Sequence, residues 1–408
     1  MTKEKKNVPA LRFPEFEDEW EEKKLGEKLE DTSIRNNNEI PLYSLTVERG
    51  LTKKTERYNR DFLVKNKENF KVVNHLNIVY NPMNITLGAI DLHSDESKVS
   101  VSGYYNVLKI IDNSNPKFLI ELLRTHKSIL SYKKVATGTL IEKQRVHFSE
   151  FKMMKKYFPS DKEQQKIGDF FSKLDRQIEL EEEKLALLEE QKKGYIQKIF
   201  SQELRFKDEN GNDYPEWEEK KLSYLGSYSK SYSFSRDVEG EGKVHHIHYG
   251  DIHSKLSSKI SDINLLPTIK ESKDFEFLQK GDIIFADASE DYKDLGKAIM
   301  VDIDEDNIIA GLHTHVFRPN LQVVSEFLMY YTKTLNYFKF IKRQGTGISV
   351  LGISKKNLSN FILGLPERRE QQKIGDFFSK LDQQIELQGQ KIESLKQRKK
   401  GLLQKMFV

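Results

Sequence analysis

One thirteen-residue stretch occurs twice in this chain and limits what the chain can fold into. Residues 163–175 and residues 370–382 both read EQQKIGDFFSKLD, at an offset of 207 residues. Each copy opens a long segment in which apolar side chains recur at alternating steps of three and four, the pattern of a coiled-coil helix. Such a helix needs a partner to bury its apolar stripe. The sequence therefore predicts two long helices, at 160–201 and 367–408, separated by dissimilar segments.

We expect the two helices to pair with each other as an antiparallel coiled coil. The alternative is that each helix packs only on its own globular segment. Polar residues interrupt both apolar seams, and antiparallel pairing with facing residue numbers summing to 580 sets Glu181 against Lys399. The same register sets Lys192 against Gln388, whereas parallel pairing would set Lys192 against Lys399, which is repulsive. The central seam positions are Ile178, Glu181, Leu185, Leu188 and Lys192, and Ile385, Gln388, Ile392, Leu395 and Lys399.

Gly168 and Gly375 occupy equivalent places inside the two predicted helices. Glycine in a helix interior costs about 1 kcal/mol relative to alanine, so its presence needs a reason. Either another backbone approaches the helix closely at this point, or the helix breaks there.

The repeated unit is larger than the helix. Similar lead-ins precede the dissimilar segments, at 11–27 and 204–226, and each contains one of the two tryptophans. Runs of β-branched and aromatic residues and one helical pattern follow each lead-in, which predicts an α/β fold with internal pseudo-twofold symmetry. We expect two similar mixed α/β domains separated by helical spacers, with the boundaries 1–159 and 202–366 for the domains and 160–201 and 367–408 for the spacers.

Composition narrows the class of protein. The chain has 67 Lys and Arg against 63 Asp and Glu, a net charge of +4, and no cysteine. This mildly basic balance is compatible with nucleic acid, and the absence of cysteine excludes a disulfide framework and a cysteine-ligated zinc. With no signal peptide and no apolar run of membrane-spanning length, we expect a cytoplasmic protein that does not contact membranes.

No motif in the chain predicts catalysis. There is no phosphate-binding GxxxxGK[ST] loop and no GxGxxG motif after a predicted strand. The cluster His245, His246 and His248 has no HExxH pattern and no nearby acidic partner, so we expect no metal site. We therefore expect a binding scaffold with no catalytic residues and no cofactor.

Several features together resemble the specificity subunit of Type I restriction–modification enzymes. They are the repeated EQQKIGDFFSKLD stretch, the lead-ins with Trp-Glu, the predicted strand at 281–285 and the loop Gln344-Gly345-Thr346-Gly347. The first copy of this loop, Ala136-Thr137-Gly138-Thr139, lacks the preceding Arg-Gln. The resemblance covers essentially the whole chain. It implies two target recognition domains, each of which reads one half of a bipartite site in double-stranded DNA.

The resemblance also implies partners. The helical spacers would set the gap between the half-sites and dock two modification subunits, while restriction subunits would join through the complex. Methyl transfer and cleavage would belong to those other subunits. The alternative functions are a coiled-coil adaptor that binds two protein partners without DNA, and a self-contained methyltransferase, which the missing cofactor loop disfavours.

We expect DNA contacts in the loops that follow the domain helices, which are predicted to end near Leu130 and Phe338. These loops combine cations for phosphate, hydroxyls and amides for hydrogen bonds, and glycines that permit close approach. The alternative is an ordinary solvated connection. The leading candidates are Lys133, Lys134, Thr137 and Thr139 in the first domain and Lys342, Arg343, Gln344 and Thr346 in the second. Weaker candidates follow predicted strands: Tyr80, Asn81, Asn84, Ser289, Asp291 and Tyr292.

Overall fold

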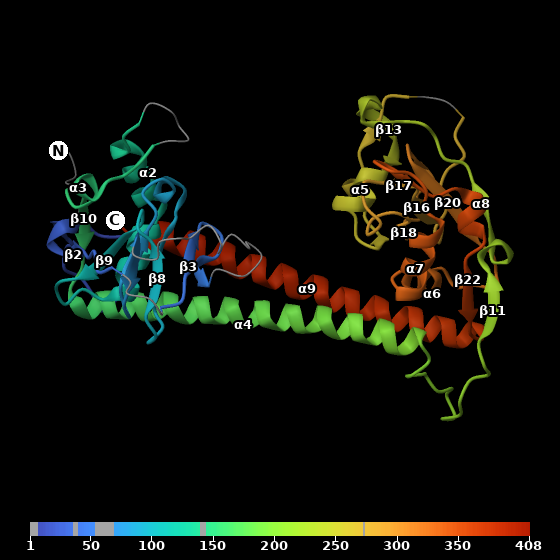
Figure 1. Cartoon of the computed structure of the whole chain (residues 1–408), viewed down its shortest axis with the longest axis horizontal. Coiled ribbons are helices and arrows are strands. Elements are labelled where there is room, and N and C mark those ends of the chain that lie inside the picture. The colour runs from blue at the N-terminus through green and yellow to red at the C-terminus, as the bar shows by residue number, and fades with distance from the viewer. Residues whose placement is uncertain (1–6, 36–39, 54–68, 139–143, 272–273) are drawn as a thin grey trace. The chain divides into compact units, whose positions relative to one another are not determined.

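The computed structural model describes residues 7–35, 40–53, 69–138, 144–271 and 274–408. The chain forms two compact units, which we call unit 1 (residues 1–182 and 390–408) and unit 2 (residues 183–389). Both predicted long helices are present without a break: α4 runs from Asp161 to Phe200 and α9 from Arg368 to Met406 (Figure 1). Each unit therefore combines one α/β domain with a segment of both helices.

Unit 1 contains a four-stranded sheet with the order β2-β9-β6-β7 and three two-stranded pairs, β1–β10, β3–β4 and β5–β8. The described strands are β1 (Glu21–Lys24), β2 (Leu29–Asp31), β3 (Tyr43–Thr46), β4 (Gly50–Lys53), β5 (Phe70–Val73), β6 (Ile78–Tyr80), β7 (Ile90–Leu92), β8 (Val99–Ser102), β9 (Asn106–Ile110) and β10 (Lys155–Phe158). The helices are α1 (Pro116–Arg124), α2 (His126–Val135) and α3 (Phe148–Phe151).

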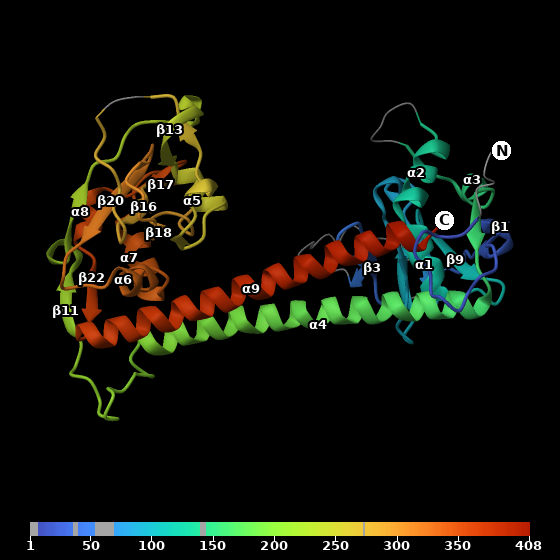
Figure 2. The ribbon, with the colours of Figure 1, turned by 180° about the vertical axis from the view of Figure 1, so that it is seen from behind.

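The core of unit 1 lies between the four-stranded sheet, α1 and the two long helices. Asn115 caps α1 by accepting a hydrogen bond from the Phe118 amide, and Pro116 fits the first turn, which needs no amide donor. The end of α9 completes this core, because Phe407 packs against Trp20 and Phe118 with ring centroids 6.1 and 5.5 Å apart. Figure 2 shows α1 beside the start of α4.

Unit 2 contains a five-stranded sheet with the order β12-β20-β16-β18-β14, a three-stranded sheet β15-β13-β19, and the pairs β11–β22 and β17–β21. The strands are β11 (Glu218–Lys221), β12 (Gly226–Ser229), β13 (Glu239–Ile247), β14 (Lys259–Ile260), β15 (Thr268–Ile269), β16 (Ile283–Ala286), β17 (Ala288–Ser289), β18 (Ala298–Val301), β19 (Ile308–Ala310), β20 (Thr314–Pro319), β21 (Leu351–Gly352) and β22 (Ile362–Leu365). The helices are α5 (Tyr249–Ser254), α6 (Ser325–Tyr331), α7 (Leu335–Gln344) and α8 (Lys355–Ser359).

β16, the central strand of the five-stranded sheet, and its neighbour β18 lie in the core of unit 2. All four residues of each strand are buried, as expected for strands covered on both faces. The end of α4 joins this core: the Phe200 ring stacks on Phe378 of α9 and meets Tyr331 of α6 edge-on, at centroid distances of 5.9 and 5.0 Å. In both units, the α/β domain therefore shares its core with α4 and α9.

The antiparallel pairing of the helices is confirmed, but the predicted register is wrong. In unit 1, Lys399 pairs with Asp175 at 2.7 Å and Lys391 pairs with Glu181 at 2.5 Å, so residue numbers rise along one helix as they fall along the other. In unit 2, Lys192 pairs with Asp382 and not with Gln388. The lysines are long enough to pass over the seam and reach carboxylates that flank it.

The two helix glycines mark close approaches and not breaks. A Cβ added at Gly168 would lie 2.6 Å from Asn115 Oδ1 and 2.9 Å from the Phe118 amide nitrogen. A Cβ at Gly375 would lie 2.8 Å from Glu326 Cβ in the first turn of α6. Each domain helix thus begins directly against a long helix, at a distance that only glycine permits.

The residues next to these glycines tie the same ends together. Gln164 accepts a hydrogen bond from the Asn115 amide and donates to the Pro159 carbonyl, at 3.1 and 3.0 Å. Gln371 accepts from the Val324 amide at 2.8 Å and donates to the Pro366 carbonyl, also at 2.8 Å. The repeated Gln-Gln stretch therefore serves to join each domain helix to a spacer helix. Within the described residues, no helix combines the length and apolar character that a membrane crossing requires.

Candidate nucleic-acid interface

In unit 1, the helical segment after Asn115 consists of two helices and not one. Thr125 ends α1 and caps α2, because its hydroxyl accepts a hydrogen bond from the Ser128 amide at 3.2 Å and donates to the Leu122 carbonyl at 2.8 Å. The second helix continues to Val135, so Lys133 and Lys134 lie in its last turn and not in a loop. Both side chains are exposed.

A two-way backbone bridge joins Thr137, just beyond the end of α2, to Arg145. We call the chain between two residues bridged in this way an excursion. The Thr137 amide donates to the Arg145 carbonyl and the Arg145 amide donates to the Thr137 carbonyl, both at 2.8 Å. Gly138 follows with a φ of 130°, which a side chain would disfavour. Thr137 is exposed at the base of this excursion, whereas Thr139 lies outside the described residues.

The candidates at the end of β6 and just beyond it are one core residue, Tyr80, and two residues that are at least partly exposed, Asn81 and Asn84. Tyr80 is fully buried, stacks on Phe151 at 4.9 Å and donates its hydroxyl hydrogen to the Val146 carbonyl at 3.4 Å. Burial also raises the pKa of the Tyr80 hydroxyl. A direct DNA contact by Tyr80 is contradicted by this position. Asn81 accepts a hydrogen bond from the Met83 amide at 3.1 Å, and Asn84 is exposed.

Unit 2 repeats the two-helix arrangement. Val324 is the N-cap residue of α6, and Thr334 caps α7 by accepting a hydrogen bond from the Tyr337 amide at 3.2 Å. The cationic residues of the predicted loop again belong to the last turn of the helix, which ends at Gln344. This last turn contains the exposed Lys342 and Arg343 and the half-buried Gln344.

The structure describes every residue of the corresponding excursion after α7, from Thr346 to Gly352. Thr346 and Gly352 form the same two-way backbone bridge, at 2.9 and 2.7 Å, and Gly347 has a φ of 120°. Gly347 therefore corresponds to Gly138, since each follows the bridging threonine with a positive φ. Within the excursion, Ile348 is 100% exposed.

The weaker candidates of unit 2 lie beside this excursion, because β17 pairs with β21. Ser289 is buried and accepts a hydrogen bond from the Asp291 amide at 3.2 Å, which contradicts a direct contact by its side chain. Asp291 is exposed but closes a turn by accepting from the Lys293 and Asp294 amides at 2.8 and 3.0 Å. Tyr292 is half-buried against Gly345, where an added Cβ would lie 3.1 Å from its ring.

The last turns of α2 and α7 carry positive charge. Within the part of the chain that the structure describes, Lys133, Lys134 and Lys342 form no ion pair, and Arg343 donates only to the carbonyl of Lys339, at 3.3 Å. Positive charge beside an exposed glycine-containing excursion suits the recognition of phosphate. We call Asn84, Lys133, Lys134 and Thr137 the first candidate surface, and Lys342, Arg343, Gln344, Thr346 and Ile348 the second candidate surface.

Sequence reasoning missed Ile348 and His313. Ile348 follows the Gly-Thr-Gly stretch, and an apolar residue between such short polar neighbours was the available signal. His313 has a φ of 56°, unusual outside glycine, and its ring lies 3.1 Å from the carboxylate of Asp287. The backbone carbonyl of Asp287 accepts a hydrogen bond from the amide of Ile353, the residue that follows the excursion. No pattern in the sequence indicated that conformation.

The histidines considered as metal ligands have local structural contacts. His246 lies 3.2 Å from the carboxylate of Glu239, and His248 caps α5 by accepting a hydrogen bond from the Gly250 amide. Burial and the nearby Arg236 lower the pKa of His248. Among the described residues, no group of three or more potential ligands is arranged to hold a metal ion.

Comparison with known proteins agrees with the repeated architecture. The family model described as "Type I restriction modification DNA specificity domain" matches residues 17–190 and again residues 214–397. The chain is 31% identical over 190 residues to the Type I restriction enzyme HindI specificity subunit of Haemophilus influenzae. That alignment covers 45% of this chain and 40% of the relative, so the match spans less than half of either protein.

Solved structures share the fold over nearly the full length. The Type I restriction–modification S subunit from M. genitalium has a TM-score of 0.59 at 16% identity, with 98% of this chain and 99% of that chain covered. A chain from a structure that describes assembly and conformational transition of the type I R-M system has a TM-score of 0.55, also at 16% identity. It covers 95% of this chain and 97% of its own length.

Proposed function

The chain belongs to the family of Type I restriction modification DNA specificity domains, and from this premise we propose that it is the DNA-reading subunit of a Type I restriction–modification complex. Each α/β domain reads one half of a bipartite site in double-stranded DNA. One observation carries the proposal: the family match occurs twice, and each copy contains a helix whose last turn carries cations without an ion pair among the described residues, followed by a two-way backbone bridge.

The first and second candidate surfaces supply the two kinds of contact that sequence recognition requires. Lys133, Lys134, Lys342 and Arg343 bind phosphates and set the register, which carries no sequence information. Thr137, Gln344 and Thr346 present hydroxyl and amide groups that can hydrogen-bond to base edges. Ile348 adds an apolar side chain suited to the methyl group of thymine or to a base step.

We assign the catalytic steps to partner subunits. Two modification subunits dock on the paired segments of α4 and α9, and restriction subunits join through them. Leu180 of α4 and Leu387 of α9 occupy equivalent positions in the repeat, and both side chains are about half exposed. Exposed apolar residues at matching places suit one partner on each copy of the repeat.

Substitutions in the second candidate surface test the proposal. Lys342→Ala is expected to weaken binding to all duplex sequences and to lower the slope of log K against log salt by about one unit, because one phosphate contact is lost. Gln344→Ala is expected to change the preference at one base of one half-site and to leave the salt slope unchanged. Binding of the complex to a randomised duplex library, titrated with salt and then sequenced, measures both effects.

Lys221→Ala is the matched control, because Lys221 is an exposed lysine of β11 outside the candidate surfaces. It is expected to change neither the affinity nor the salt slope. If Lys342→Ala behaves like Lys221→Ala, α7 does not lie on DNA and the second candidate surface is wrongly assigned.

A further inference from the structure

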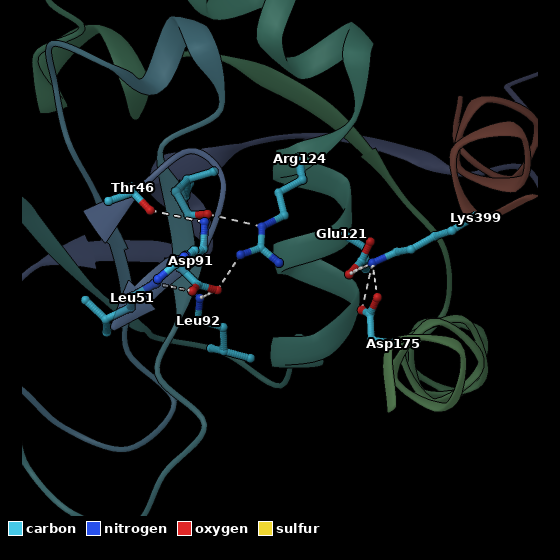
Figure 3. Close-up of polar contacts among 10 residues, drawn as sticks. Thr46, Leu51, Asp91, Leu92, Glu121, Arg124, Asp175 and Lys399 are labelled. Carbon is cyan, nitrogen blue, oxygen red and sulfur yellow. Dashed lines mark hydrogen bonds and ion pairs between the residues drawn. The ribbon is translucent and has the colours of Figure 1, made fainter. Parts of the chain in front are cut away.

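Helix α1 is held by polar contacts on two sides. Figure 3 shows Arg124 on one side, paired with Asp91, and Lys399 on the other side, close to Glu121 and Asp175. Asp91 also accepts hydrogen bonds from the amides of Leu51 and Leu92, at 2.6 and 2.8 Å. The Arg124 contacts therefore keep α1 within its own domain, whereas Lys399 belongs to α9.

The Lys399 ammonium joins three elements of unit 1. It lies 3.0 Å from Glu121 Oε1 of α1 and 2.7 Å from both carboxylate oxygens of Asp175 of α4. We call these residues the first lysine cluster. Glu121 is buried, which raises its pKa, and Lys399 opposes this shift by favouring the ionised carboxylate. The Lys399 ammonium of α9 thus compensates the buried negative charge of Glu121 in α1.

Unit 2 repeats the cluster with one change of chemistry. Lys192 and Asp382 stand in the repeat positions of Lys399 and Asp175, and Tyr330 is the sixth residue of α6, as Glu121 is of α1. We call Lys192, Asp382 and Tyr330 the second lysine cluster. Lys192 pairs with Asp382 and lies 5.6 Å from the centre of the Tyr330 ring, whose hydroxyl donates to Asp382 at 2.7 Å.

The domain helix of each lysine cluster, α1 or α6, is followed directly by the helix that carries a candidate surface. α1 leads through the Thr125 cap directly into α2, whose last turn contains Lys133 and Lys134. α6 leads through the Thr334 cap into α7, whose last turn contains Lys342. The orientation of the first domain helix therefore sets where the cations and the excursion point.

We propose that Lys399 and Lys192 are positioning residues for DNA recognition. Each lysine leaves one long helix and joins the other long helix to the domain helix, so each domain is oriented only while both helices are paired. The domain of unit 1 depends in this way on the last turns of α9, and that of unit 2 on the second half of α4. This inference rests on the proposed function, and it adds the residues that fix how each half-site is presented.

The test uses the full chain assembled with its modification subunits and a randomised duplex library as the probe. Bound duplexes are sequenced to obtain the two half-sites and the gap. For Lys399→Met, we expect the preference at one half-site and for one gap length to fall about tenfold, the size of one mismatched base pair, while the other half-site is unchanged. Lys192→Met is expected to relax the opposite half-site.

Lys396→Met is the matched control. Lys396 lies three residues before Lys399 on α9 and pairs with Glu182 at 2.6 Å, but both side chains are about half exposed. Exposed ion pairs contribute little, so this variant is expected to select the same duplexes as the unmodified chain. Melting temperatures of all variants show whether the fold is retained.

A double variant separates positioning from stability. Lys399→Met together with Glu121→Met removes the uncompensated carboxylate and is expected to restore the melting temperature. If Lys399 only stabilises the fold, selectivity returns with it, and the inference is overturned. If Lys399 positions the domain, the gap preference stays relaxed. A wild-type complex that selects no bipartite site would instead refute the proposed function itself.

Discussion

Glu370→Ala is expected to lower the free energy of unfolding of unit 2 by about 3 kcal/mol. The Glu370 side chain is 0% exposed and accepts hydrogen bonds from Arg205 Nε and Nη2 at 3.1 and 2.7 Å. It also accepts from the indole nitrogen of Trp217 at 3.1 Å. Alanine would leave a guanidinium and an indole donor without their acceptor, which costs far more than the loss of an exposed pair.

Urea denaturation followed by tryptophan fluorescence measures this effect, because the only tryptophans, Trp20 and Trp217, report on different units. The control is Asp213→Ala in the same lead-in. Asp213 pairs with Lys207 at 3.7 Å, and their side chains are 79% and 63% exposed, so a change within about 0.5 kcal/mol is expected. Equal effects of Glu370→Ala and Asp213→Ala would show that the buried pair does not hold the lead-in.

Gly168→Ala is expected to destabilise unit 1 by about 2 kcal/mol, although alanine normally stabilises a helix interior. The new Cβ would lie 2.6 Å from Asn115 Oδ1, the atom that caps α1. The helices can separate only by weakening this cap, which alone is worth about 1 kcal/mol. The overlap therefore outweighs the gain in helix propensity.

Gly401→Ala is the matched control in α9, because nothing lies within 4 Å of its added Cβ. It is expected to stabilise the protein by about 1 kcal/mol. Urea denaturation of both variants, followed at Trp20, tests the difference in sign. Stabilisation by Gly168→Ala would mean that α1 does not approach α4 as closely as the structure indicates.

The long helices could be predicted from sequence because their signal is local. The apolar spacing predicts α4 and α9, and the polar residues that interrupt the two seams predict the antiparallel direction of their pairing. Their register could not be predicted in the same way. Lys399 finds Glu121, which is 278 residues away in the chain, and no pattern within the seam could indicate that a domain helix supplies a partner.

The candidate surfaces were predicted only in part, for a similar reason. The cationic stretches were recognised by composition, but their helical conformation depends on Thr125 and Thr334, which end one helix and cap the next. The burial of Tyr80 depends on Val146 and Phe151, which lie more than sixty residues further along the chain. Residues that follow a strand could thus be found from sequence, but not the direction in which each side chain points.

The measurement that tests the central claim most directly is the exchange of one recognition block. Residues 28–159 are replaced by the corresponding block of another family member, and the complex is selected on the randomised duplex library. The account predicts that one half of the bound site changes while the other half and the gap remain. A change in both halves, or a bound site that does not change at all, would contradict recognition by two independent domains.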